Sequence, residues 1–65
     1  MTYNITFSRN SSASLATLAN EKAVTALIDA KIATGMSFDD AANEALVQHF
    51  GADVMARADD VAVEA

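Results

Sequence analysis

The chain has 65 residues and no cysteine, so it holds one domain at most, without disulfides or thiolate metal sites. Apolar residues make up 52% of it, too many for a disordered acidic segment, and two glycines with no proline favour helices over turn-rich β architecture. The net charge is −5 and the four basic residues (Arg9, Lys22, Lys31 and Arg57) are scattered, so the sequence shows no basic patch for nucleic acid.

We expect neither a membrane span nor a signal peptide in this sequence. The N-terminal residues carry only Arg9 as a charge and lack the apolar core of a signal peptide, and no stretch resembles a membrane span. We expect a cytoplasmic protein, in the host cell if a phage encodes it, with no cofactor. A domain this short buries only about 60% of the surface of its unfolded chain, so we expect oligomerisation or a larger partner to bury more.

The first predicted element is a strand over residues 3–8. Its large apolar side chains, those of Tyr3, Ile5 and Phe7, alternate with polar ones. A period of two with aromatic and β-branched residues is typical of a half-buried strand. The polar residues 9–12 form a turn-like break after it.

Residues 13–34 contain no glycine or proline and many alanines, which favours one long helix. Within it Val24, Ile28 and Ile32 repeat every four residues and, with Leu27, form an apolar helical stripe.

The start of this helix is open. Asn20 followed by Glu21 is typical of an N-cap with an acid in the first turn, which would begin the helix at Glu21. Residues 14–19 would then be a second strand paired with the first, or a separate turn of helix. We favour a continuous or nearly continuous helix.

A turn at Gly35 separates this helix from the next, predicted over residues 38–50. Gly35 suits the left-handed position that ends a helix. Ser37 can cap the next helix, with Asp40 at the acid position of a capping box. One face of the second helix carries Phe38, Ala41, Ala42, Ala45, Leu46, His49 and Phe50.

After Gly51, residues 52–58 are predicted to add a further turn of helix. Residues 59–65 form a short, uncapped acidic tail that we expect to be frayed, with Val61 and Val63 in no assured contact. The predicted fold class is therefore mainly α with a short N-terminal β segment, a strand followed by two amphipathic helices.

No catalytic or metal-binding motif is present. His49 is the only histidine and has no ligand set around it, so we expect it to pack at the edge of a helix interface. The pair Asp39 and Asp40 is explained by helix capping, and the pair Asp59 and Asp60 by a solvated tail. The sequence predicts a protein that is not an enzyme.

Several apolar residues are candidates for a partner-binding surface. Val47 falls on the otherwise polar face of the second helix, and Met36, Met55 and Phe50 join it as candidates. Surplus apolar side chains on a domain with a thin core indicate a surface for a partner.

The stretch 34–46 resembles the second-helix region of ribbon-helix-helix proteins. In that family a helix ends in glycine, an apolar residue and a capping serine follow, and the next helix has paired apolar residues before a Glu-Ala-Leu-like run. Those places are taken here by Met36, Ser37, Ala41, Ala42, Glu44, Ala45 and Leu46. Residues 20–34 have about the length of the family's first helix, so the resemblance covers residues 20–50.

This resemblance implies an intertwined homodimer whose N-terminal strands pair into a two-stranded ribbon that, in the family, enters the DNA major groove. By family spacing the strand would be Leu15–Ala19, which has no basic or amide side chain to read bases. The better strand pattern lies nearer the N-terminus. The resemblance therefore supports the dimer more than the binding of DNA.

These features favour a small acidic protein-binding module, such as a phage or mobile-element inhibitor or adaptor of a larger protein, including one that binds nucleic acid. One alternative is a ribbon-helix-helix regulator or antitoxin that binds DNA as a homodimer, although the charge disfavours nucleic acid. Another is a virion or assembly accessory protein. The sequence does not separate the first from the last.

Overall fold

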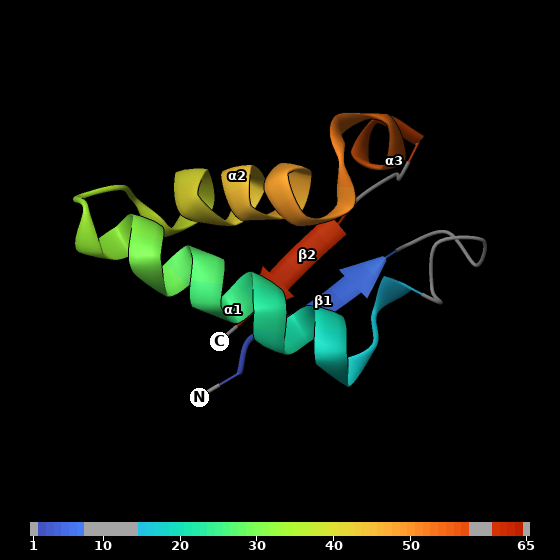
Figure 1. Ribbon diagram of the computed structural model, residues 1–65, viewed down its shortest axis with the longest axis horizontal. Coiled ribbons are helices and arrows are strands. Elements are labelled where there is room, and N and C mark those ends of the chain that lie inside the picture. The colour runs from blue at the N-terminus through green and yellow to red at the C-terminus, as the bar shows by residue number, and fades with distance from the viewer. Residues whose placement is uncertain (1, 8–14, 58–60, 65) are drawn as a thin grey trace.

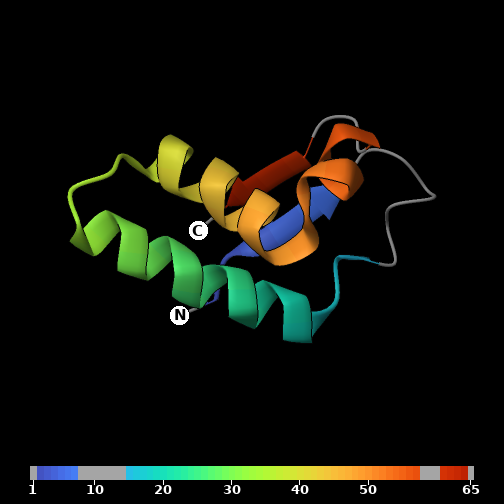
Figure 2. The same cartoon turned by 45° about the horizontal axis from the view of Figure 1, so that its top comes forward.

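The computed structural model describes residues 2–7, 15–57 and 61–64. It is a small, mainly helical domain in which a hairpin of two helices lies against a two-stranded antiparallel sheet (Figures 1 and 2). In chain order the elements are β1 (Asn4–Phe7), α1 (Leu18–Ala33), α2 (Phe38–Phe50), α3 (Ala52–Arg57) and β2 (Val61–Glu64). The expected N-terminal strand and two helices are present, and a C-terminal strand completes the sheet.

The C-terminal strand pairs with the N-terminal one. β2 runs antiparallel to β1, with Val63 opposite Ile5 and Val61 opposite Phe7. Both valines are half-buried and pack against the core, where contact with the buried side chains across the sheet stabilises them. The prediction of a frayed tail is therefore wrong for residues 61–64. Residues 59, 60 and 65 of that tail lie outside the described residues.

This pairing is formed within one chain. It differs from the ribbon that the family resemblance implies, in which each of two chains contributes one strand. The face of the sheet that turns away from the helices carries Asn4, Thr6, Ala62 and Glu64, all exposed. Polar and small side chains on one face, with apolar ones on the other, are typical of an antiparallel sheet that has solvent on one side.

The first helix begins at Leu18, between the two starts that the sequence left open. Thr17 is its N-cap, and Thr17 Oγ1 accepts a hydrogen bond of 3.2 Å from the Asn20 backbone N–H. The predicted cap at Asn20 is wrong, because the Asn20 side-chain amide donates to the Leu15 carbonyl at 2.8 Å and holds the segment before the helix. Residues 15–17 lead into α1 and form no second strand.

Side chains of α1 occupy the edge of β1 that faces away from β2. The Ile5 N–H donates to Glu21 Oε2 at 2.9 Å, and the Tyr3 N–H donates to Thr25 Oγ1 at 2.9 Å. A buried donor left unpaired costs about 1–3 kcal/mol, so these acceptors stabilise the docking of the strand on the helix. Glu21 and Thr25 are one turn apart and therefore lie on the same face of α1.

Tyr3 makes a second link between the N-terminal segment and the helices. Its phenol donates to Asp29 Oδ1 at 3.1 Å, and its ring meets that of Phe38 edge-on with centroids 5.4 Å apart. The hydrogen bond to Asp29 raises the pKa of Tyr3 above 10.0, and partial burial and the negative charge of Asp29 act in the same direction. The phenol therefore keeps its proton at neutral pH and remains a donor.

Gly35 and Ser37 shape the turn between α1 and α2. Gly35 has φ of 105°, a left-handed conformation that favours glycine, and its N–H donates to the Ile32 carbonyl at 2.9 Å. Ser37 Oγ accepts a hydrogen bond of 3.3 Å from the Asp40 backbone N–H. This N-cap starts α2 at Phe38, and the helix spans 38–50 as predicted.

The hydrophobic core lies between the helix hairpin and the sheet. Its buried members are Ile5, Phe7, Val24, Ile28, Ala41, Ala42, Ala45 and Leu46. Ile32 departs from the predicted stripe of the first helix, since its side chain is 38% exposed. It lies in the last turn of α1, at the end of the hairpin that extends beyond the sheet (Figures 1 and 2).

Candidate functional site

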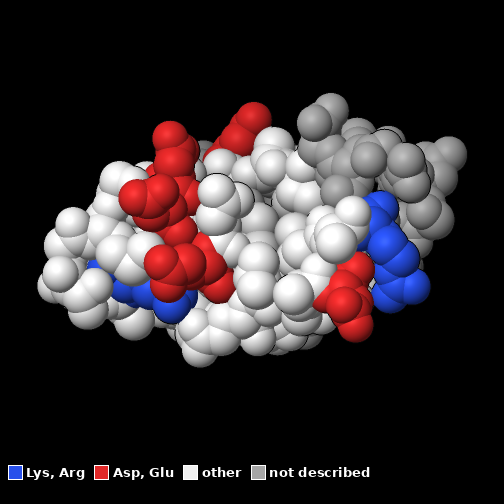
Figure 3. Space-filling view, turned by 90° about the horizontal axis from the view of Figure 1, so that it is seen from above, with Lys and Arg blue, Asp and Glu red and all other residues white. Residues whose placement is uncertain are grey.

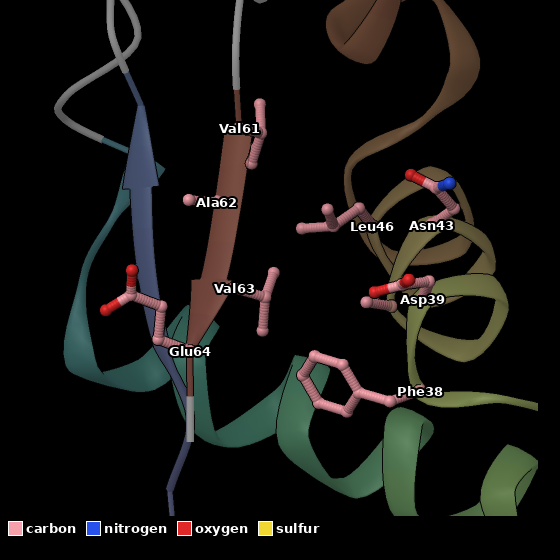
Figure 4. Close-up of a pocket in the computed structure, with 9 residues that line it drawn as sticks. Phe38, Asp39, Asn43, Leu46, Val61, Ala62, Val63 and Glu64 are labelled. Atoms are coloured by element: carbon pink, nitrogen blue, oxygen red, sulfur yellow. The ribbon is translucent and has the colours of Figure 1, made fainter.

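A groove of about 540 Å³ lies between α2 and β2, and we call it the α2–β2 groove. Its apolar walls are formed by Phe38, Ala42 and Leu46 on the helix and by Val61 and Val63 on the strand. Figure 4 shows the two valines pointing toward α2, while Leu46 and Phe38 point back toward the strand. Ala42 and Leu46 are themselves only 7% and 3% exposed, so apolar side chains form the base of the groove, while its exposed surface is more polar than apolar.

The local sequence explains both walls. Phe38, Ala42 and Leu46 are four residues apart, and side chains with that spacing share one face of a helix. Val61 and Val63 are two apart, so they share one face of the strand. The N-cap at Ser37 and the pairing of β2 with β1 bring the two walls opposite each other.

Acidic residues flank the groove. Asp39 on α2 and Glu64 on β2 both contribute to its lining, together with the amide of Asn43. In Figure 4 the Asp39 side chain lies on the groove side of α2, whereas Glu64 projects from the opposite face of the strand. Both carboxylates are exposed, and neither forms an ion pair with another residue that the structure describes.

The negative charge continues over α2. Figure 3 shows acidic side chains gathered over one part of the face seen from above, and α2 contributes Asp39, Asp40 and Glu44 as exposed acids. Within the described ranges the only ion pair joins Lys31 Nζ to Glu44 Oε1 at 3.5 Å. An exposed pair of this kind neutralises little of the local field.

Among the described residues, none pairs with the backbone at the outer edge of β2. The backbone N–H groups of Tyr3 and Ile5 point toward α1, where they donate hydrogen bonds. Because backbone groups alternate in direction along a strand, those of Asn4 and Thr6 point toward β2 and form the ladder with it. Val61 and Val63 lie opposite the residues that do not bond across the ladder, so their N–H and C=O groups point outward. No hydrogen bond from these groups to any other described residue is present.

The four predicted partner-binding residues are not brought together. Val47 is 45% exposed and borders a shallower hollow of about 360 Å³ on the outer face of α2, with Asn43. Met36, Phe50 and Met55 are half-buried and pack against the core. Phe50 meets the ring of Phe7 edge-on at a centroid distance of 5.9 Å. Of the four, only Val47 is exposed.

His49 lies at the junction of the two long helices. Its Nε2 is 3.0 Å from Asn20 Oδ1, and its ring packs edge-on against Phe50 with centroids 4.8 Å apart. No three histidine, aspartate or glutamate side chains come together as a metal site in the described ranges. The geometry of His49 is that of a polar contact between α1 and α2.

The cations that the structure describes do not form a surface for phosphates. Lys22 is exposed near the start of α1, and Lys31 is paired with Glu44. Arg57 Nε donates to the Asp53 carbonyl at 3.3 Å at the other end of the molecule from Lys31. The solvent-facing side of the sheet has no Lys or Arg among its described residues and ends in Glu64. Arg9 lies outside the described residues.

Comparisons with protein-family models, with curated proteins and with solved structures find no match to this chain. In the part of the chain that the structure describes, no helix has the length and apolar character needed to cross a membrane.

Sequence reasoning missed the groove because it missed β2. The signal was present in Val61-Ala62-Val63-Glu64, where two β-branched residues alternate with others as in a strand. That pattern is only four residues long, and it lies in an acidic C-terminal segment of the kind that is usually frayed. Phe38 and Leu46 were assigned to the apolar face of the second helix, but nothing in that helix shows that part of the face remains open.

Proposed function

We propose that this protein is a small non-enzymatic binding module that docks on a basic protein partner through the α2–β2 groove. The observation that supports this is an open groove with apolar side chains at its base, beside the exposed carboxylates of Asp39 and Glu64. Apolar contact supplies binding energy, while the acidic flanks select a partner of opposite charge and speed encounter. An inhibitor or adaptor of a basic protein is the function that fits this site.

Neutralising the flanks of the groove should weaken partner capture. We expect Asp39→Asn combined with Glu64→Gln to lower the affinity for a basic partner by about two- to thirtyfold, since each exposed charge contact contributes about 0.2–1 kcal/mol. The measurement is a pull-down from the native host, followed by titration calorimetry with the purified partner at two salt concentrations.

The matched control is Asp40→Asn combined with Asp53→Asn, which makes the same change in net charge outside the groove. Asp39 and Asp40 are both exposed acids in the first turn of α2, so their removal costs similar helix stability. Equal weakening by both double variants would assign binding to net charge and reject the groove. In the same assay, Val47→Asp tests the outer face of α2, and unchanged capture would remove Val47 from the interface.

Binding to duplex DNA should be absent. With a net charge of −5 and with Glu64 on the solvent face of the sheet, we expect no retardation in a gel-shift assay even at about 50 mM salt, where phosphate contacts are strongest. A basic ribbon-helix-helix protein serves as the positive control. Salt-sensitive retardation at low micromolar protein would replace the binding-module proposal with a DNA-binding one.

A further inference from the structure

The two outer edges of the sheet differ in how they are protected. The edge of β1 is occupied by α1, whose Glu21 and Thr25 accept hydrogen bonds of 2.9 Å from the strand. The edge of β2 has no such cover from described residues, and its outward groups belong to Val61 and Val63. Proteins commonly block exposed strand edges because these edges pair readily with other chains. The bare edge of β2 borders the groove.

The groove and this edge form one continuous surface. All four residues of β2 line the groove, although Figure 4 shows Ala62 and Glu64 projecting their side chains away from α2. Their share in the lining therefore comes from the backbone along the strand. A site built from a strand edge, an apolar floor and a facing helix matches the requirements for recognising an extended peptide by strand addition.

From this geometry we infer that the α2–β2 groove binds an extended basic segment of the partner as a third strand, antiparallel to β2. The inference rests on the protein-binding function proposed above and specifies its mode. Backbone groups of the segment pair with Val61 and Val63, and its alternate apolar side chains lie on the same face of the sheet as these valines, toward α2. The intervening side chains are Lys or Arg, which lie beside Glu64 on the face of the sheet that turns away from α2.

The charge of the site selects this occupant over a second copy of the chain. Pairing of β2 with β2 of another molecule would bring two chains of net charge −5 together, with Asp39 and Glu64 of each close to the shared edge. Repulsion between two chains of the same net charge opposes such a contact. A basic segment gains from the same carboxylates.

The test uses short labelled peptides and fluorescence anisotropy with the full chain. The probe is a peptide in which lysine and valine alternate, compared with a peptide of the same composition in two blocks. Two further versions carry backbone N-methyl groups, either on the valines or on the lysines. In antiparallel pairing the valine N–H groups face β2, so methylating them should weaken binding about tenfold or more, whereas methylating the lysines should leave most of the affinity.

A protein variant gives the reciprocal measurement. Val63→Pro removes one outward N–H, and proline is tolerated on an edge strand where that N–H faces solvent. We expect circular dichroism to show a folded protein that has lost most of its affinity for the alternating peptide. The N-methyl series requires no change in the protein, so it decides the question if this variant unfolds.

The possible outcomes distinguish the strand-addition mode of binding from the proposed protein-binding function. Equal binding of the alternating, block and N-methylated peptides would overturn strand addition, while charge-dependent partner capture would leave the binding module intact. Loss of both peptide binding and partner capture would overturn both. A dimer seen by light scattering that Val63→Pro dissolves would replace the basic segment with a second copy as the occupant.

Discussion

Ile28→Ala should leave the protein largely unfolded in native buffer. Ile28 lies on α1 and is a fully buried member of the hydrophobic core. Shortening a buried isoleucine to alanine costs about 2–5 kcal/mol, because apolar contacts are lost and a cavity remains. A domain of this size rarely has more than about 3–5 kcal/mol of stability from its core. The measurement is urea denaturation followed by far-ultraviolet circular dichroism.

Ile32→Ala is the matched control, because it makes the same chemical change one helical turn later in α1. Ile32 is 38% exposed, so we expect a loss of less than about 1.5 kcal/mol and a protein that stays folded. Similar losses at the two positions would contradict the packing described here. They would instead support the continuous apolar stripe through Ile32 that the sequence alone suggests.

Removing residues 61–65 should also unfold most of the protein. The truncation exposes Ile5 and Phe7, now 4% and 8% exposed, and removes the ladder that holds β1. Losing the cover of two half-buried valines and the associated hydrogen bonds should cost about 3 kcal/mol or more. Thermal and urea denaturation of the truncated chain measure this loss. A frayed tail would give no change in stability.

A substitution on the solvent-facing side of β2 is the control for the truncation. It changes the same strand without removing any packing against the core. Ala62 is exposed and points away from the helices, so Ala62→Thr should change stability by less than about 0.5 kcal/mol. If the truncation proved harmless, β2 would contribute nothing to the fold. The α2–β2 groove would then lose one of its walls, and both proposals that depend on it would fail.

The second helix was predictable from the sequence because its determinants are local. Gly35 and Ser37 act through backbone groups within a few residues, and the four-residue spacing of apolar side chains defines one face without reference to the rest of the chain. β1 was predictable for the same reason. Apolar and polar side chains alternate strictly over Tyr3–Phe7, and this pattern indicates a strand with one buried face without reference to the rest of the chain.

The start of α1 was not decided by local preferences. Thr17 and Asn20 are both good N-cap residues, and the sequence around each permits a helix start. The fold selects Thr17, because Asn20 donates to Leu15 while its Oδ1 lies 3.0 Å from His49 Nε2 on α2. The helix start at Thr17, rather than at Asn20, thus goes together with a contact between residues that are 29 positions apart in the sequence.

The candidate site depends on the longest-range feature of the fold. By itself the sequence determined the helical hairpin, the N-terminal strand and the negative charge, all of which follow from neighbouring residues or from composition. Only the tertiary structure decided that Val61–Glu64 is a strand, because a strand of four residues gains its stability from pairing with Asn4–Phe7 and from the core beneath. That pairing creates the α2–β2 groove and leaves the adjacent edge of β2 without a partner among the residues that the structure describes.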